Sequence, residues 1–321
     1  MHTCRIACLL LCTVSFAPVF AQTYPSKPVR IISPFPAGGP ADAMLRPLAQ
    51  KMSESLKVQC IVDNRPGANG IIGTELAVRA APDGYTLVLG STSSLPMNAA
   101  IYPKLPFDPI RDLAPIGAFG YSVQILTVHP SLPAATVKEF IALAGARPGE
   151  ISVASPGIGS APHFALEMFS AMTGTRLLHV PYKGGGPALA EQLAGQVMAY
   201  FGSMQAAMPQ IRAGRLRALG VAALQRSPAA PTIPTIAESG VPGFEVGGIF
   251  GLLAPAKTPR EIILKLNAEI IRAAALPDFA GSLRAVGTDP LATTPEEFAD
   301  IIRNDMPKWA KVAREANIRA E

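Results

Sequence analysis

The sequence is poor in the residues that disulfides and metal sites require. Only 4 of its 321 residues are cysteine, 4 are histidine and 16% are Asp, Glu, Lys or Arg, whereas an average soluble domain has about 25% charged residues. Beyond position 21 the one cysteine is Cys60, in an apolar run where a buried thiol is expected, and His129, His163 and His179 show no H-x-x-x-H spacing. We therefore expect no internal disulfide and no metal.

Runs of one charge are also absent. The formal net charge is +5, but Lys and Arg form neither a basic tail nor a stretch interleaved with aromatic residues, so nucleic-acid binding is not expected. In residues 157–161, Ser160 is not at the position that the nucleophile of a G-x-S-x-G elbow occupies. The same segment fails the dinucleotide-binding pattern G-x-G-x-x-G, because Pro162 stands where the third glycine is needed. Residues 184–187 lack the Lys-Ser or Lys-Thr of a phosphate loop. We expect no nucleotide and no cofactor.

The first feature that is present is an export signal over residues 1–21. Arg5 provides a positive charge near the N-terminus, and residues 6–16 form an apolar run. Pro18 ends this run shortly before Ala21, the expected cleavage position. The apolar stretch is shorter than the ~20 residues that cross a bilayer, which favours a cleaved signal over a membrane anchor. We expect cleavage after Ala21 and a periplasmic protein.

The rest of the chain alternates between short apolar runs and amphipathic stretches. Each run ends in a loop rich in Gly or Ser that opens a helical pattern, as in parallel sheets with crossover helices. In such α/β folds, ligands bind outside the carboxyl ends of the strands, so these loops should face one cleft. The five clearest junctions follow residues 29–33, 86–90, 151–154, 177–180 and 197–201.

A weak internal repeat predicts two lobes. Residues 126–144 and 252–271 both read as a strand, then proline, then a helix, which suggests that the chain crosses twice between lobes. We place the crossings near Tyr121 and Gly248. One lobe is then formed by residues 22–121 and 249–321, and the other by residues 122–248.

Two of the loops suggest what the cleft binds. Residues 37–42 and 157–160 place unpaired N–H groups at helix starts, where the helix dipole favours an anion. Their glycines let the main chain approach a ligand closely. A cleft rich in donors and poor in acid–base groups is suited to binding a small carboxylate without transforming it, so we expect no enzyme.

Individual residues leave alternatives open. Asp42 either caps its helix or orients the loop by accepting from water or backbone N–H groups. His163 is either a half-buried structural residue or a ligand contact, and Phe35 is either core or cavity wall. Ser160 and His163 would share a helix face, as a nucleophile–base pair does, but a serine that opens a helix is usually its N-cap. The candidate ligand-binding residues are Phe35, Ala37, Gly38, Gly39, Asp42, Ser91, Thr92, Gly159, Ser160, His163, Tyr182 and Ser203.

Five ordered motifs resemble a known family. Together they are similar to the Bug-type solute receptors of tripartite tricarboxylate transporters, the TctC family, over essentially the whole chain after residue 21. The motifs are residues 24–32 (YPSKPVRII), 34–39 (PFPAGG), 63–70 (DNRPGANG), 82–87 (PDGYTL) and 180–186 (VPYKGGG).

The resemblance implies a type II periplasmic binding protein with two α/β lobes joined by two crossing strands. It implies that a ligand carboxylate is bound between residues 35–42 and 157–163, largely by main-chain N–H groups and bridging waters. Its partners would be an organic acid or amino acid and the membrane permease subunits, with the receptor a monomer. Two alternatives remain: an input protein for a sensor kinase, and a periplasmic hydrolase that uses Ser160 and His163.

Overall fold

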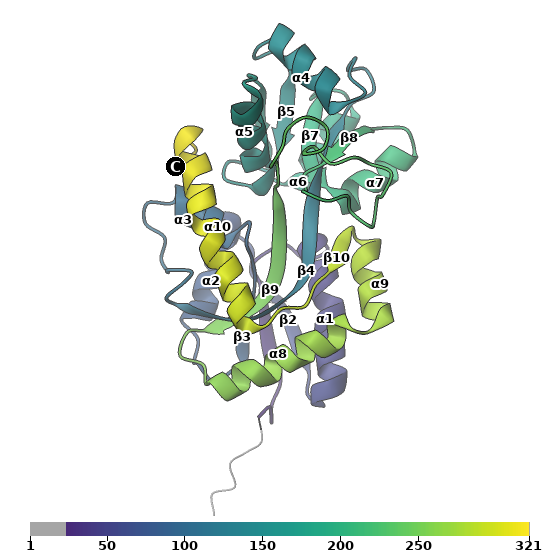
Figure 1. The fold of residues 1–321 in the computed structure, drawn as a ribbon. Helices are drawn as coiled ribbons and strands as arrows, with labels where there is room; N and C mark the ends of the chain where they lie inside the picture. Colours follow the sequence, from purple (N-terminus) through teal and green to yellow (C-terminus); the bar gives the residue numbers. More distant parts are fainter. Residues whose placement is uncertain (1–23, 321) are drawn as a thin grey trace, which may run out of the picture.

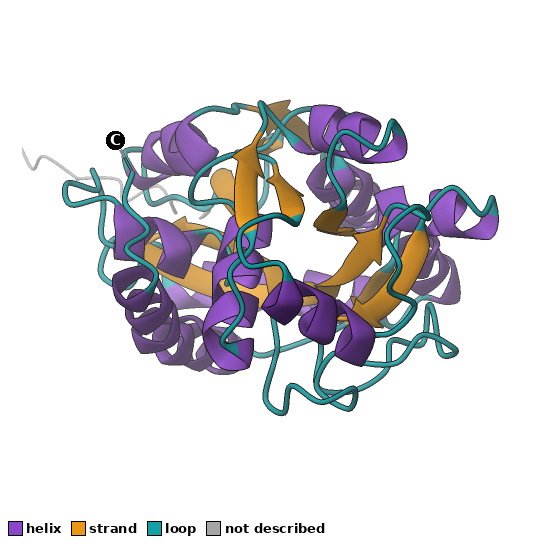
Figure 2. Cartoon of the chain, turned by 90° about the horizontal axis from the view of Figure 1, so that it is seen from above, coloured by secondary structure: helices purple, strands orange, loops and turns teal. Residues whose placement is uncertain are grey.

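The computed structural model describes residues 24–320 and has two α/β lobes, one above the other in Figure 1. The predicted signal over residues 1–21 and its cleavage after Ala21 lie outside the described residues. Seen from above, the strands lie inside and the helices outside (Figure 2). Within residues 24–320, every helix is too short or too polar to cross a bilayer.

The strands form one ten-stranded sheet that runs through both lobes. They are β1 (Val29–Ser33), β2 (Cys60–Asn64), β3 (Thr86–Ser91), β4 (Leu113–Val128), β5 (Ser152–Ser155), β6 (Leu178–Pro181), β7 (Ala199–Ser203), β8 (Arg217–Val221), β9 (Gly247–Pro255) and β10 (Thr288–Pro290). In one lobe β1 pairs in parallel with β2 and β3, and in the other β5 pairs in parallel with β6 and β7. Parallel pairs need long crossover connections, which here contain helices.

Strands β4 and β9 connect the lobes. They run antiparallel to each other, with Tyr121 opposite Ile249 and Ser122 opposite Gly248. Farther along, β4 pairs with β7 and β8, so this one 16-residue strand belongs to the sheet of both lobes (Figure 1). The predicted crossing points lie on this pair, while the lobe boundaries at residues 121 and 248 stay a prediction.

Helices follow the strands as the sequence predicts, and each of the five predicted strand–loop–helix junctions is present. Three of the strands, β5, β6 and β7, begin one or two residues later than expected. The helices are α1 (Pro40–Leu56), α2 (Ile71–Val78), α3 (Leu95–Ile101), α4 (Val137–Ala146), α5 (Ala161–Thr173), α6 (Gly185–Leu193), α7 (Met204–Arg212), α8 (Arg260–Ala274), α9 (Pro277–Ala285) and α10 (Pro295–Glu315), and a short 3-10 turn, η1, spans Ala68–Gly70.

The last helix packs against both lobes. Trp309 of α10 is 1% exposed and belongs to the same buried cluster as Phe164 of α5. The two rings lie edge to face with centroids 5.6 Å apart. The earlier part of α10 buries Phe298 in the core of the other lobe. The helix therefore ties the C-terminal segment to both cores, as its course along the molecule in Figure 1 suggests.

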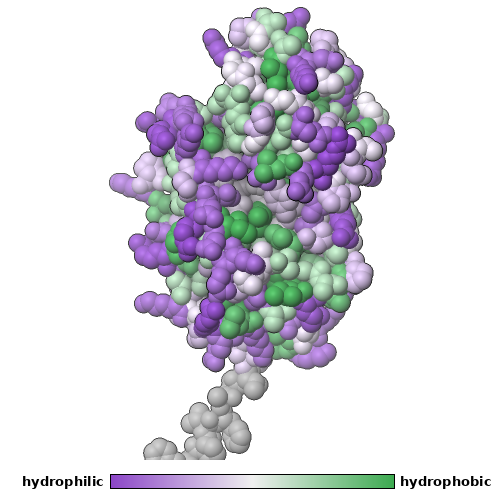
Figure 3. All heavy atoms as spheres, viewed as in Figure 1, coloured by the Kyte–Doolittle hydropathy of each residue, from purple (hydrophilic) through white to green (hydrophobic). Residues whose placement is uncertain are grey.

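Apolar side chains on the surface are dispersed. In the view of Figure 3, hydrophobic residues form separate groups among polar ones rather than a continuous band. Cys60, expected to be buried, is only half-buried at the edge of the core formed around β1.

Candidate functional site

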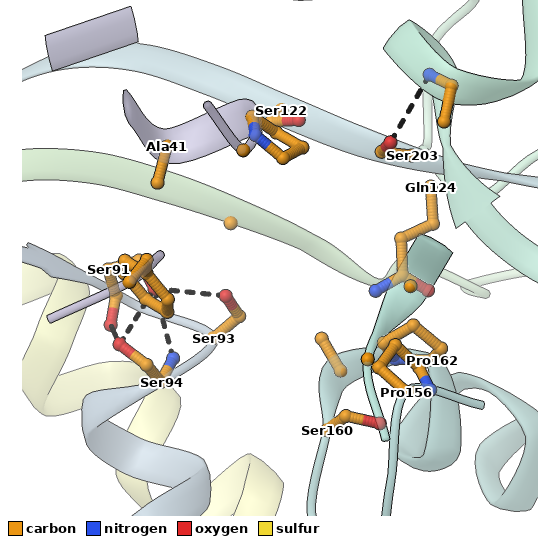
Figure 4. Close-up of a pocket in the computed structure, with 18 of the residues that line it drawn as sticks. Ala41, Ser91, Ser93, Ser94, Ser122, Gln124, Pro156, Ser160, Pro162 and Ser203 are labelled. Carbon is orange, nitrogen blue, oxygen red and sulfur yellow. Dashed lines mark hydrogen bonds between the residues drawn. The ribbon is translucent and has the colours of Figure 1, made fainter. Parts of the chain in front are cut away.

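A cavity of about 680 Å³ lies between the two lobes. Its wall is formed by the loops after β1, β3, β5, β6 and β7 together with β4 and β9, so the five predicted loops do face one cleft (Figure 4). The volume is within the range of small-molecule sites, ~300–1,000 Å³. Among the described residues that line it, none is Asp, Glu, Lys, Arg or His. An anion in this cleft would be stabilised by dipoles alone.

The start of α1 leaves a main-chain donor unpaired in a residue of the cavity wall. The first backbone bond of the helix runs from the N–H of Ala43 to the carbonyl of Gly39, at 3.0 Å. The N–H of Ala41 precedes that bond and therefore has no partner within the helix. Ala41 lines the cavity (Figure 4), so this unpaired N–H belongs to a residue of the cavity wall.

Asp42 orients the loop before α1. Its carboxylate accepts from the N–H of Gly38 at 3.0 Å, from Arg46 Nε at 2.7 Å and from Asn64 Nδ2 at 2.9 Å. Burial alone would raise the pKa of Asp42, but these hydrogen bonds outweigh it and hold the pKa below its ordinary value. Of the alternatives for Asp42, the geometry favours the orienting role, and Gly38 gives its N–H to Asp42 rather than to the cavity.

The start of α5 provides a second donor on the other lobe. The N–H of Phe164 bonds to the carbonyl of Ser160 at 3.1 Å, which leaves the earlier N–H of Ala161 without an intrahelical partner. Ser160 and Ala161 both line the cavity. Across the cleft, Asn69 Nδ2 donates to the carbonyl of Gly159 at 3.0 Å and so links η1 to this loop.

Two stacked imidazoles support the loop before α5. The rings of His163 and His179 are 4.0 Å apart and nearly parallel, with an interplanar angle of 9°. His163 Nδ1 accepts from the N–H of Gly159 at 3.2 Å, and His179 Nε2 lies 2.6 Å from Ser155 Oγ. Burial, and then the neighbouring His163, lower the pKa of His179 to about 4. At neutral pH, His179 is therefore uncharged where it stacks on His163.

Stability is expected to fall with acidification in one window. An unfolded histidine has a pKa of about 6.5, so between about pH 6.5 and 4 the unfolded chain takes up a proton that folded His179 does not. The folded state should lose about 1–3 kcal/mol across that window and no more below it. Urea unfolding from pH 7.5 to 4 measures this, with His179→Asn expected to flatten the slope and His129→Asn to retain it. An unchanged slope in His179→Asn would contradict the assignment.

The predicted ligand-binding residues fall into two groups. Five are not among the lining residues. Three of them, Asp42, Gly159 and His163, have been described above. Thr92 makes two hydrogen bonds of 3.1 Å with Ile249: its Oγ1 accepts from the Ile249 N–H, and its own N–H donates to the Ile249 carbonyl. Tyr182 packs beside an apolar cluster under α6. The residues that do line the cavity are Phe35, Ala37, Gly38, Gly39, Ser91, Ser160 and Ser203.

Several lining residues were not predicted. Ser93 and Ser94 lie in a loop that the sequence did identify, and both hydroxyls are within 3.0 Å of Ser91 Oγ (Figure 4). Ser122 and Gln124 lie within the long strand β4, and only the crossing predicted near Tyr121 could have suggested them. Further unpredicted lining residues include Met44, Asn69, Tyr200 and Phe250.

The geometry gives a hydrolase little support. Ser160 Oγ donates to the carbonyl of Gly157 at 2.6 Å, and His163 uses Nδ1 to accept from Gly159. A nucleophile and its base share a hydrogen bond in such enzymes, whereas within residues 24–320 no bond joins Ser160 to His163. The described part of the chain also has no group of three or more His, Cys, Asp or Glu placed to bind a metal ion.

Comparisons with known proteins agree on one family. A family model described as "Tripartite tricarboxylate transporter family receptor" matches residues 44–318. Protein BugT of Bordetella pertussis is 38% identical over 304 residues, 94% of this chain and 93% of BugT. The structure of R. palustris Rpa4515 with adipate is 32% identical, with a TM-score of 0.85 over 92% of this chain and 99% of that one. MatC from Rhodopseudomonas palustris with bound malate is 30% identical, with a TM-score of 0.80 over 90% and 99%.

Proposed function

Because this chain belongs to the family of tripartite tricarboxylate transporter receptors, we propose that it is a periplasmic receptor for a small carboxylate. The observation that carries the proposal is the pair of unpaired N–H groups, at Ala41 and Ala161, on opposite sides of a cleft without charged lining residues. Helix starts stabilise anions through their free donors and dipoles. Two structural neighbours, Rpa4515 with adipate and MatC with bound malate, support the ligand class.

In this proposal one carboxylate lies between the starts of α1 and α5. The N–H groups of Ala41 and Ala161 donate to it from the two lobes, while Ser91 and Ser203 contact the rest of the ligand. Asp42 and His163 contribute by fixing the two loops rather than by touching the ligand. Because the cleft offers donors but no base or nucleophile aligned for chemistry, the ligand leaves unchanged.

Ligand binding would close the two lobes, and the closed arrangement would signal that the site is occupied. A ligand that touches both lobes favours the closed arrangement in proportion to its extra contacts there. The bond from Asn69 to Gly159 crosses the cleft in the same direction and would add to closure. The moving bodies are proposed to be residues 22–121 with 249–321, and residues 122–248. As an exported monomer, the receptor would deliver its ligand to the permease subunits.

A thermal-shift screen of carboxylic acids tests the proposal. A ligand that binds only the folded state stabilises it by about 2.7 kcal/mol at one hundred times its Kd, so an acid of the right size should raise the melting temperature clearly. The methyl ester of the same acid is the matched control and should give no shift. Isothermal titration then measures Kd. A folded protein that binds no acid of a broad panel contradicts the proposal, as does equal binding of acid and ester.

A further inference from the structure

A buried tyrosine presents an unused hydroxyl to the cavity. Tyr200 of β7 is 5% exposed and lines the cavity. Its hydroxyl has no hydrogen-bond partner among residues 24–320, although buried tyrosine hydroxyls usually find one. Burial raises the pKa of Tyr200, so the group remains a neutral O–H donor. The side chain is thus a fixed donor whose partner must come from within the cavity.

Two glycines make room for this side chain. Gly202, two residues along the same strand, presents the same face, and a Cβ there would lie 3.0 Å from Cε1 of the Tyr200 ring. A Cβ at Gly185 would lie 3.3 Å from the Tyr200 hydroxyl. The ring therefore passes over Gly202 and places its hydroxyl beside the first residue of α6.

The start of α6 adds two main-chain donors at the same place. Its first backbone bond runs from the N–H of Ala188 to the carbonyl of Gly184, at 3.3 Å. The N–H groups of Gly185 and Gly186 precede that bond and have no partner within the helix. Both glycines line the cavity. These two N–H groups and the positive end of a nine-residue helix therefore lie on the same part of the cavity wall as the Tyr200 hydroxyl.

This group of donors is separate from the pair at Ala41 and Ala161. It belongs to the loop after β6, whereas Ala161 belongs to the loop after β5, the neighbouring parallel strand. We propose that Tyr200 is a specificity-determining residue: its hydroxyl, with the N–H groups of Gly185 and Gly186, binds a second anionic oxygen of the ligand. The inference rests on the proposed function, because it extends the same ligand site.

The variant Tyr200→Phe tests this with pairs of acids that differ at one end. Succinate, glutarate and adipate are each compared with their own monoamide, which has the same shape and one charge fewer, by isothermal titration. A hydrogen bond to a charged group contributes about 1.5–3 kcal/mol, which is about ten- to a hundredfold in Kd. Tyr200→Phe should lose at least about tenfold affinity for the best dianion, and its loss for the monoamide, whose amide oxygen accepts only a neutral hydrogen bond, should be several-fold smaller.

Tyr102→Phe is the matched control, since Tyr102 also packs against a buried apolar cluster but lies outside the cavity lining. It should bind every acid as the unaltered chain does. Equal losses for the dianion and the monoamide in Tyr200→Phe would overturn the proposal, and so would no loss for either. If the unaltered chain binds other acids of the broad panel but none of these dianions, the proposal for Tyr200 fails while the proposed function stands. If it binds no acid of the panel, the proposed function itself fails.

Discussion

Ser160→Asp is expected to weaken carboxylate binding by at least about a hundredfold. Ser160 lines the cavity and is the N-cap of α5, with φ −73° and ψ 155°, and aspartate caps helices as well as serine does. The new carboxylate would face the ligand carboxylate at the same helix start. Two like charges 4 Å apart repel by about 4 kcal/mol at an effective dielectric constant of 20, and the open cleft screens part of this.

Ser160→Asn isolates the charge. It has nearly the same shape as Ser160→Asp, caps the helix equally well, and loses the same bond from Ser160 Oγ to the carbonyl of Gly157. Its affinity for the acid should remain within about tenfold of the unaltered chain, in line with the loss of one neutral hydrogen bond. Titration of both folded variants with the same acid decides the point: equal affinities would mean that no ligand carboxylate lies at the start of α5.

Trp309→Ala is expected to cost about 3–5 kcal/mol of the free energy of unfolding. The indole is 1% exposed and packs edge to face on Phe164, so its removal leaves a cavity where α10 meets α5. Since a native domain is stable by only about 5–15 kcal/mol, this is a large part of the total. Urea unfolding monitored by circular dichroism measures the change in midpoint.

Trp309→Phe is the comparison that separates packing from other effects. It keeps an aromatic ring beside Phe164 and should lose clearly less than Trp309→Ala, because the residual cavity is smaller. A loss below about 1 kcal/mol for Trp309→Ala, the usual range for surface positions, would show that α10 does not anchor the C-terminal segment to the core around Phe164.

Local sequence signals were sufficient for the parallel strands and their helices. Each of β1, β3, β5, β6 and β7 is a short apolar run ended by a loop rich in Gly or Ser, and each loop faces the cleft because it follows the carboxyl end of a strand. The pairing of β4 with strands from both lobes depends on distant partners, so no local pattern encodes it. The same holds for Trp309. The apolar periodicity of its segment indicates a helix, but it does not indicate which of the two cores the indole enters.

Within the site, sequence reasoning located the loops better than the side chains. In the sequence, Asp42 and His163 belong to the loops that were expected to face the ligand. In the structure, their side chains instead accept hydrogen bonds from the N–H groups of Gly38 and Gly159. Because a buried polar group must be paired, these residues fix the loop instead of lining the cavity. Gln124 and Tyr200 line it from strand interiors, where nothing in the local sequence distinguishes a cavity wall from a core.

The most direct test of the account is a crystal structure of the chain with the acid that binds most tightly. Carboxylate oxygens are expected within hydrogen-bond distance, about 2.7–3.2 Å, of the main-chain nitrogens of Ala41 and Ala161, directly or through one water. A carboxylate bound away from both helix starts, or touching one lobe only, would contradict it.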